Sequence, residues 1–216
     1  MKKTVISLIH PSRGRAKKAF NTYSEWILKA SQNFIIEHIL SADSDDNEIE
    51  IYKAIFNNVI ISDNCCVVEA TNIAAKKSKG DILVYLSDDF YCPEKWDESI
   101  VEAFGNRISE PCLLKVDDCL QSFAVKVLTI PIMTRHLYNK LGYFWHPEYK
   151  SMFVDEDLWW TCDNNNWIIK VPYLRFEHHH PANGKAKTDE TYTRSSANWN
   201  QGKEIFAKRK SLNFPI

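Results

Sequence analysis

The segment that decides the fold reads Lys79-Gly-Asp-Ile-Leu-Val-Tyr-Leu-Ser-Asp-Asp89. Its apolar centre predicts a buried strand over residues 81–86. Asp88 and Asp89 follow this strand at once, and carboxylate oxygens are the ligands that Mg²⁺ and Mn²⁺ prefer. The segment therefore predicts either a metal-binding pair at the edge of a sheet or, because aspartate is common in loops, an ordinary turn.

On both sides of this segment, apolar strands alternate with helical patterns. Gly80 has the position of a helix C-cap, and Pro93 has the position of a helix start. The alternation over the first hundred residues predicts an α/β sheet with parallel strands. The other expected strands cover residues 5–9, 34–40 and 59–61, and the expected helices cover residues 16–32, 66–79 and 93–104.

The second half of the chain has a less regular pattern. Asp155, Glu156 and Asp157 precede a short helical stretch, where acidic residues suit the N-terminal helix dipole. Residues 181–216 carry seven lysines and arginines against three aspartates and glutamates, which makes this segment mildly basic. The expected strands here cover residues 113–116, 123–130 and 167–172, and the expected helices cover residues 134–141 and 158–164.

The composition is that of an ordinary globular protein. Apolar residues make up 44% of the 216 residues and charged residues 25%, which suits one domain with a buried core. Lysine plus arginine number 27 and aspartate plus glutamate 28, which excludes a polybasic protein. No apolar run approaches the roughly 18 residues of a membrane span, and residues 5–9 are too few for a signal-peptide core. We therefore expect a cytoplasmic protein without an integral membrane segment and with reduced cysteines.

Charged residues follow three of the expected strands. Arg13 and Arg15 come after the first strand, Asp43 after the second, and the Asp88–Asp89 pair after the fourth. Because ligands of parallel sheets bind beyond the carboxyl ends of the strands, we expect these loops to face one crevice. Basic and acidic groups that converge in this way suit a phosphate ligand bridged by a metal ion.

The order of these motifs resembles that of glycosyltransferase family 2. The resemblance covers roughly residues 4–180 and implies the GT-A fold, which is an α/β fold with a single, mostly parallel, Rossmann-like sheet flanked by helices. It departs from the family at Ser87, where the first aspartate of a D-x-D motif is usual. The matching features are a nucleotide loop at Pro11–Arg15, a base-recognition loop at 40–46, a helix with Asn72 that leads to a D-x-D-type turn, and an acceptor-side segment at 134–160 with a Glu-Asp motif.

The resemblance also implies a division of the chain. Residues 1–180 are expected to form the GT-A domain, with a nucleotide-binding half at 1–105 and an acceptor half at 106–180. Residues 181–216 are expected to form a basic loop and helix that pack on the same domain.

Members of the family that resemble this chain transfer a sugar from a nucleotide diphosphate to a hydroxyl group with the help of a metal ion. By the resemblance, Asp89 binds Mn²⁺ or Mg²⁺ with His178 or His180, and Asp157 is the general base with Glu156 beside it. The residues expected at the nucleotide sugar, expected to be a UDP-sugar, are Pro11, Arg13, Arg15, Asp43, Asn72, Asp88 and Lys185. The structural alternatives are solvated arginines, turn-forming aspartates, strand-end histidines and a helix cap at 155–157.

Two acceptor classes stay open. The pattern resembles short bacteriophage glycosyltransferases, some of which glycosylate hydroxymethylated pyrimidines in DNA, and such an enzyme would act in the host cytoplasm. The basic residues 181–216, with Trp199 among them, would suit this polyanionic acceptor. A polysaccharide or lipopolysaccharide acceptor is the other class. A non-catalytic carbohydrate- or nucleic-acid-binding module with the same fold is the alternative to an enzyme.

Overall fold

The computed structural model of the chain describes residues 3–63 and 66–216. The strands are β1 (Val5–Pro11), β2 (Ile35–Asp43), β3 (Val59–Ser62), β4 (Ile82–Tyr85), β5 (Phe90–Tyr91), β6 (Leu113–Asp117), β7 (Ile132–Thr134), β8 (Ile168–Arg175) and β9 (Glu177–His178). The helices are α1 (Ala16–Lys29), α2 (Ile49–Ile55), α3 (Val67–Lys77), α4 (Trp96–Phe104), α5 (Arg135–Leu141), α6 (Val154–Asp163), α7 (Glu190–Ser196) and α8 (Trp199–Ser211). Short 3₁₀ turns cover Gly105–Ser109 and Pro181–Asn183.

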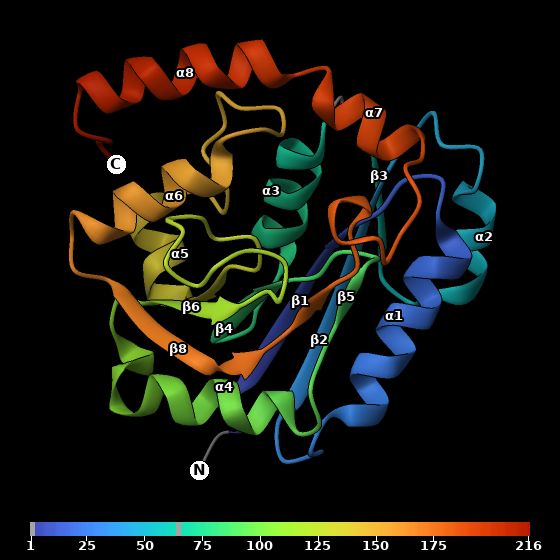
Figure 1. Cartoon of the computed structure of the whole chain (residues 1–216). Coiled ribbons are helices and arrows are strands. Elements are labelled where there is room, and N and C mark those ends of the chain that lie inside the picture. Colours follow the sequence, from blue (N-terminus) through green and yellow to red (C-terminus); the bar gives the residue numbers. More distant parts are fainter. Residues whose placement is uncertain (1–2, 64–65) are drawn as a thin grey trace.

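One sheet of seven strands forms the centre of the molecule, in the order β3-β2-β1-β4-β7-β6-β8 (Figure 1). β1 is parallel to β2 and β4, β3 is parallel to β2, and β8 is parallel to β6. Only β7 runs against its neighbours, β4 and β6, within this described sheet. The expectation of a mostly parallel sheet flanked by helices is confirmed.

Alternate residues of the central strands enter two separate cores. Ile6 packs in a core with Trp26 of α1 and Trp96 of α4, all three fully buried. Ile9 and Leu83 point to the opposite face, which α3, α5 and α6 cover. Because both faces of the sheet are covered, the central strands are apolar almost without interruption.

The loop between β6 and β7 corrects one expectation. Residues 123–130 were expected to form a strand, but they form an irregular loop. The Lys115 ammonium donates a hydrogen bond to the carbonyl of Val127 (2.5 Å), and the Thr129 hydroxyl donates to Asp118 (2.6 Å). Leu128 is buried in the core. The apolar residues of this loop therefore reflect packing under a folded-back loop, and not pairing in the sheet.

Gly80 has a different role from the expected helix C-cap. α3 already ends at Lys77, and the next residue, Ser78, is in the extended conformation. Gly80 lies against β1, where a Cβ atom would stand 2.3 Å from the Ser7 hydroxyl oxygen and 2.7 Å from the Ser7 backbone nitrogen. Only glycine permits this approach of the chain to β1.

A short antiparallel ribbon joins the middle of the chain to its last third. β5 pairs with β9, so that Phe90 lies opposite His178. The backbone N–H of His179 also donates to the carbonyl of Asp89 (2.9 Å). This ribbon therefore holds the three consecutive histidines beside the turn that follows β4.

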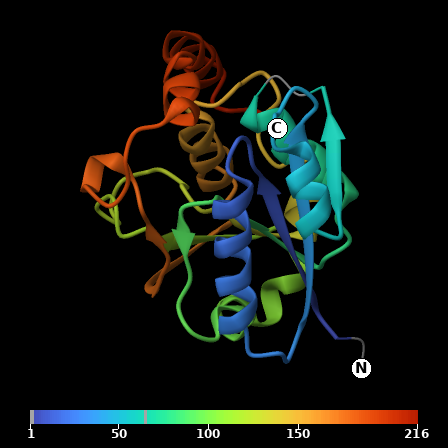
Figure 2. The same ribbon diagram turned by 90° about the vertical axis from the view of Figure 1, so that its right-hand side faces the viewer.

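The C-terminal helices lie at the end of the molecule to which β1 points, as both ribbon views show (Figures 1 and 2). α7 follows the loop after β9, and α8 packs on α6. Within the described parts of the chain, the helices fall short of the length and apolar character that crossing a lipid bilayer requires.

Candidate functional site

The carboxyl ends of β1 and β2 bring oppositely charged side chains together. Pro11 ends β1 beside Ser41, and the loop after it carries Arg13. The Arg13 guanidinium donates to Asp43 at the end of β2 (2.6 Å) and to the exposed Asp45 (2.5 Å). Parallel strands end at one edge of the sheet, which is why residues 30 positions apart meet here.

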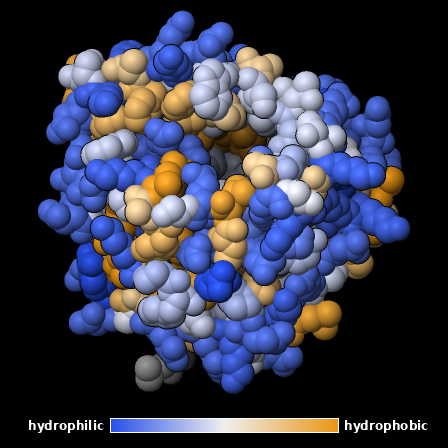
Figure 3. Space-filling model, in the orientation of Figure 1, coloured by the Kyte–Doolittle hydropathy of each residue, from blue (hydrophilic) through white to orange (hydrophobic). Residues whose placement is uncertain are grey.

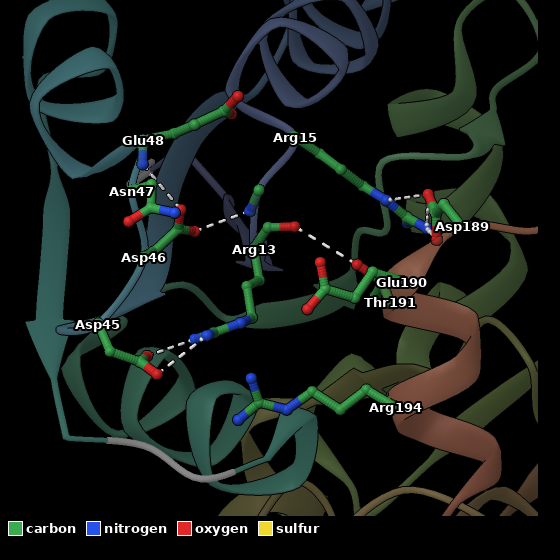
Figure 4. Close-up of a pocket in the computed structure, with 11 residues that line it drawn as sticks. Arg13, Arg15, Asp45, Asp46, Asn47, Glu48, Asp189, Glu190, Thr191 and Arg194 are labelled. Carbon is green, nitrogen blue, oxygen red and sulfur yellow. Dashed lines mark hydrogen bonds and ion pairs between the residues drawn. The ribbon is translucent and has the colours of Figure 1, made fainter.

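A pocket of about 280 Å³ opens beside this pair (Figure 4). Its walls are the loop 13–15, the loop 45–48 and residues 189–191 with Arg194. Arg15 reaches across the pocket to Asp189, which accepts from its Nε (2.9 Å) and one Nη (2.6 Å). The pocket thus combines three guanidinium groups, the side chains best suited to bind phosphate in a fixed orientation, with five carboxylates, of which Asp45 and Asp189 pair with Arg13 and Arg15. The face of the molecule in Figure 3 is hollowed between α6 and α7, below α8.

Asp89 is the carboxylate that faces this edge of the sheet. One of its oxygens accepts from Ser87 (2.7 Å) and the other from the Tyr192 hydroxyl of α7 (2.5 Å). The Lys18 ammonium lies 4.0 Å away and the His178 Nε2 atom 3.8 Å away. Burial alone would raise the pKa of Asp89, but His178, Tyr192 and Ser87 outweigh it and hold this pKa below the usual value. Asp89 is therefore a charged carboxylate at pH 7.

Asp89 and His178 suit a divalent cation. Burial lowers the pKa of His178, which favours the neutral imidazole that binds metals. Its Nδ1 atom is buried and has no hydrogen-bond partner among the described residues. No group of three or more potential ligands occurs in the described ranges, 3–63 and 66–216. Mg²⁺ is commonly held by one or two carboxylates together with substrate phosphates, and Asp89 supplies one such carboxylate.

His180 lies close to these groups, but it has a further role. Its ring packs edge-on against His178 and against Tyr192, with centroids 5.0 Å apart in both cases. Its Nδ1 atom accepts from the backbone N–H of Ala182 (3.0 Å) and caps the 3₁₀ turn that follows. His178 is thus better placed than His180 to bind a metal ion with Asp89.

Asp88 points away from the crevice into the protein. Asp88 and Asp89 are about equally buried, at 3% and 2% exposed, and they differ in their partners. The Asp88 oxygens accept from His10 Nε2 (2.9 Å) and from the Ser12 hydroxyl (3.0 Å), whereas Asp89 accepts from Tyr192 of the surface helix α7. This geometry corrects the expectation that Asp88 contacts the nucleotide. Asp88 and Asp89 lie in the turn between β4 and β5, where their carboxylates have different partners.

Two more expected donor-site residues have other partners. The Asn72 side chain lies in the middle of α3, where it accepts from the backbone N–H groups of Phe144 and Trp145 and donates to the Trp145 carbonyl. It fastens a loop to α3, which corrects the expected nucleotide contact. The Lys185 ammonium pairs with Glu177 (2.8 Å), outside the residues that line the 280 Å³ pocket.

Asp157, the expected general base, lies inside the protein. It is 1% exposed, and the Arg209 guanidinium of α8 donates to its Oδ2 atom (2.5 Å) and to its Oδ1 atom (3.2 Å). The Tyr149 hydroxyl also donates to Oδ2 (3.0 Å). A carboxylate held in this way has no access to an acceptor hydroxyl, so the expectation for Asp157 is corrected by the structure.

Asp155 lies on the opposite side of the same helix. Residues two apart on an α-helix differ by about 200° in direction, so Asp155 and Asp157 face opposite ways. Asp155 is close enough to Tyr85 to raise the pKa of that phenol, as do Asp88 and Asp89. Burial raises the pKa of Asp155 itself, and burial likewise raises that of its neighbour Glu156. Asp155 is therefore the carboxylate of this helix that approaches the edge of the sheet where Asp89 lies.

The spacing of apolar residues in α6 already indicates which of the two aspartates, Asp155 or Asp157, points into the protein. Val154, Asp157 and Leu158, Thr161, and Cys162 are all buried and follow the spacing of one helix face. Asp157 thus belongs to the buried face, and Asp155 does not. Asp189 and Tyr192 were also missed, because nothing in their local sequence indicates that α7 reaches Arg15 and Asp89.

Comparison with known proteins shows similarity at the level of structure alone. No known family model matches the sequence, and no curated protein matches it either. Among solved structures, the fragment 1–349 of Staphylococcus aureus TarS with UDP-GlcNAc matches with a TM-score of 0.63 and 14% identity, over 87% of this chain and 60% of that one. The mannosyltransferase PcManGT from Pyrobaculum calidifontis, with GDP-Man and Mn²⁺, gives 0.63 and 11%, over 82% and 57%. GalNAc-T7 with UDP, GalNAc and Mn²⁺ gives 0.64 and 14%, over 82% and 44%.

These matches show that the chain has the GT-A fold of glycosyltransferases. The chain spans 60% or less of each of these three structures, so parts of those proteins have no counterpart here. The low identity means that the likeness concerns the fold, and the chemistry of this chain has to be argued from its own residues.

Proposed function

We propose that this protein is a metal-dependent glycosyltransferase that moves a sugar from a nucleotide diphosphate sugar to a hydroxyl acceptor. The observation that carries the proposal is the approach of His178 Nε2 to the Asp89 carboxylate, at 3.8 Å, across 89 residues of sequence. A carboxylate and an imidazole beside a pocket that Arg13, Arg15 and Arg194 help to line suit a nucleotide diphosphate bound with a metal ion. The solved relatives in fold that contain UDP, GDP-Man and Mn²⁺ support the same ligand class.

Asp89 and His178 are the residues that would hold the ion. A divalent ion bound there would supply Lewis-acid stabilisation of the negative charge that develops on the leaving diphosphate. Arg13 and Arg15 now pair with Asp43 and Asp189. When those pairs open, the two guanidinium groups donate charge-assisted hydrogen bonds to the same phosphates. In this proposal Asp43, at the end of β2, accepts from the nucleotide base. UDP is the nucleotide that we propose.

Asp155 is the residue that we propose as general base, in place of Asp157. A base must accept the proton of the acceptor hydroxyl as the new glycosidic bond forms, and a raised pKa brings a carboxyl closer to the pH of the reaction. Lys115 and Asp118 act on Asp155 with opposite signs, the ammonium lowering its pKa and the carboxylate raising it. The assignment presumes inversion at the anomeric carbon.

Donor binding tests the proposal directly. At one hundred times Kd, a ligand adds about 2.7 kcal/mol to the free energy of unfolding, which raises Tm by about 5–10 °C for a chain of this length. We expect this shift with Mn²⁺ and UDP, and its loss in Asp89→Asn. Asp81→Asn is the matched control, because Asp81 directly precedes β4 at its opposite end, where its side chain accepts from the Val5 N–H (2.9 Å). If Mn²⁺ with UDP, GDP, CDP or ADP leaves Tm unchanged, the proposal is wrong.

The base is tested by the pH dependence of turnover. Asp155→Asn is expected to bind donor normally and to lower kcat about a hundredfold or more. In the unchanged protein, the raised pKa of Asp155 places the acidic limb of kcat above the usual value of an aspartate, near 3.9. Lys115→Met removes a positive charge that favours the ionised form, so this limb should move to higher pH. A limb that stays in place would contradict the assignment of Asp155.

For the acceptor, we propose a hydroxymethylated pyrimidine in phage DNA, with a polysaccharide or lipopolysaccharide as the alternative in the same reaction class. The support is the basic character of residues 181–216, of which Lys203 and Lys210 lie exposed on α8. Transfer of labelled sugar to DNA with and without hydroxymethylcytosine separates the two classes. A nucleotide-induced Tm shift without slow hydrolysis of any UDP-sugar would favour a non-catalytic module.

A further inference from the structure

Asp88 is the centre of a buried hydrogen-bond network that joins four elements of the fold. Besides the His10 and Ser12 contacts to its carboxylate, its backbone carbonyl accepts from the Thr22 hydroxyl of α1 (2.7 Å). His10, Ser12, Thr22 and Asp88 are all buried. Because the partners of Asp88 belong to β1, to the loop after β1 and to α1, the network holds these parts of the fold together.

The direction of each hydrogen bond follows from the carboxylate. An ionised carboxylate only accepts, so the Ser12 hydroxyl gives its proton to Asp88. The Tyr52 hydroxyl, 2.8 Å from the Ser12 oxygen, must then donate to it, and it accepts in turn from the backbone N–H of Arg15 (3.0 Å). The chain of donors runs from Arg15 through Tyr52 and Ser12 to Asp88. It therefore ties the backbone of the arginine loop, residues 11–15, to the turn that carries Asp89.

His10 holds the other oxygen of Asp88 and is itself held. Since its Nε2–H donates to Asp88, its Nδ1 atom accepts from His38 Nε2 of β2, 2.9 Å away. Burial and the nearby His10 keep the pKa of His38 well below its usual value, which leaves that ring neutral. His38 stacks on Tyr23, with ring centroids 4.2 Å apart. The orientation of the His10 ring is thus set from both sides.

A second buried polar residue of β1 shows what an ordinary core hydrogen bond looks like on the same strand. Ser7 is as buried as His10, donates to Glu37 (2.5 Å) and accepts from the Gly80 N–H (2.8 Å). These partners lie at the opposite end of β1 from the pocket. The two residues have similar burial and differ in whether their partners belong to the arginine loop.

We propose that His10 is a positioning residue of the donor site: by fixing Asp88, and through Ser12 and Tyr52 the loop 11–15, it places the arginines beside Asp89. The consequence for donor binding rests on the proposed function, whereas the ordering of the loop does not. His10 itself touches neither ligand nor metal ion, and it acts through the backbone of the loop.

Limited trypsin cleavage of the full chain tests the ordering of the loop without any donor. His10→Leu removes the hydrogen bond, and cleavage after Arg13 and Arg15 should become about tenfold faster, because loss of a buried hydrogen bond to a charged group costs about this factor in the ordered population. His10→Gln keeps an N–H able to reach Asp88 and should restore most of the protection. Ser7→Ala is the matched control, expected to lower Tm and to leave these two cleavages within about twofold of the unchanged chain.

Two further measurements keep the proposal testable. If His10→Leu fails to fold, Tyr52→Phe removes only the hydroxyl that joins Ser12 to Arg15, and it should give the same faster cleavage. The Kd for Mn²⁺–UDP should rise about tenfold in the variants with a loosened loop and stay unchanged in Ser7→Ala. Cleavage in His10→Leu or Tyr52→Phe that is no faster than in Ser7→Ala would overturn the proposal. Absence of UDP binding in the unchanged chain would refute the proposed donor, while cleavage would still decide the role of His10.

Discussion

The two C-terminal helices, α7 and α8, are both attached to the body of the protein by an Arg–Asp pair, but the two pairs differ in burial. In the pair that holds α8, the side chains of Arg209 and Asp157 are 6% and 1% exposed. In the pair that holds α7, the side chains of Arg15 and Asp189 are 10% and 45% exposed. Because a buried charge without a partner is costly and an exposed one is not, opening the first pair leaves two buried charges, whereas opening the second leaves only that of Arg15.

The other contacts of the two helices follow the same division. α8 packs on α6 with Ile205 and Phe206 at the edge of the core, and Gly202 lies against the carbonyl of Met152. None of the seven residues of α7 is buried. Apart from the pair to Arg15, α7 reaches the body through polar contacts such as that of Tyr192 with Asp89. α8 is thus part of the folded core, whereas α7 lies at the surface and is held by polar contacts.

The largest effect is expected from breaking the buried pair. Arg209→Met leaves the Asp157 carboxylate buried without its cation, which should lower the free energy of unfolding by about 3–5 kcal/mol. Lys208→Met is the control on the same helix, since Lys208 pairs with Glu148 in an exposed position (3.2 Å) and should change stability by at most about 1 kcal/mol. Urea unfolding of both variants measures the difference. Equal effects would mean that α8 is held no more firmly than an exposed helix.

A smaller effect is expected where α8 makes its closest approach. In Gly202→Ala, the new Cβ would stand 2.4 Å from the Met152 carbonyl oxygen, so the helix has to move away at a cost of about 1–3 kcal/mol. Gln201→Ala, one residue earlier and exposed, places the same methyl side chain at a position without this contact. A stability gain in Gly202→Ala would show that alanine's helix propensity outweighs the contact and that α8 packs loosely.

The smallest effect on stability, together with a gain in binding, is expected at α7. Asp189→Asn weakens an exposed pair and should change the free energy of unfolding by at most about 1 kcal/mol. Because the Asp189 carboxylate occupies the guanidinium that we assign to the diphosphate, affinity for Mn²⁺–UDP should rise about two- to fivefold. Calorimetric titration measures this, with Glu190→Gln on the same helix as the control. Weaker binding in Asp189→Asn would mean that α7 assists the donor and does not compete with it.

Much of the central sheet was predictable because its signals are local. The apolar run from Ile82 to Leu86 corresponds to β4, and the Thr134 hydroxyl and Gly142 bound α5 as their residue types suggest. Residues 123–130 were wrongly predicted to form a strand. Their composition is typical of strands, but in the described structure they form a loop whose buried apolar residues pack against the core. Local composition predicts well that a segment is buried, but it does not predict whether the buried segment is a strand or a loop.

The candidate site was predictable as a region and less so residue by residue. Ligands bind at the carboxyl ends of parallel strands, and this rule predicts from the sequence that Arg13, Arg15, Asp43 and Asp89 lie at one edge of the sheet. It could not decide between Asp88 and Asp89, because that choice depends on His10 and Ser12, more than 70 residues away. The inward direction of Asp157 likewise depends on Arg209, 52 residues further along the chain.

By itself, the sequence determined the alternation of strands and helices, the mostly parallel sheet and the edge at which charged side chains gather. Those properties depend on periodicity, capping and polarity within short windows, which the order of residues contains directly. Only the tertiary structure decided that Asp88 and Asp157 turn inward, that His178 meets Asp89, and that α7 lies across the arginines. Each of these depends on a partner far away in sequence, and such pairings form only when the chain has closed around its core.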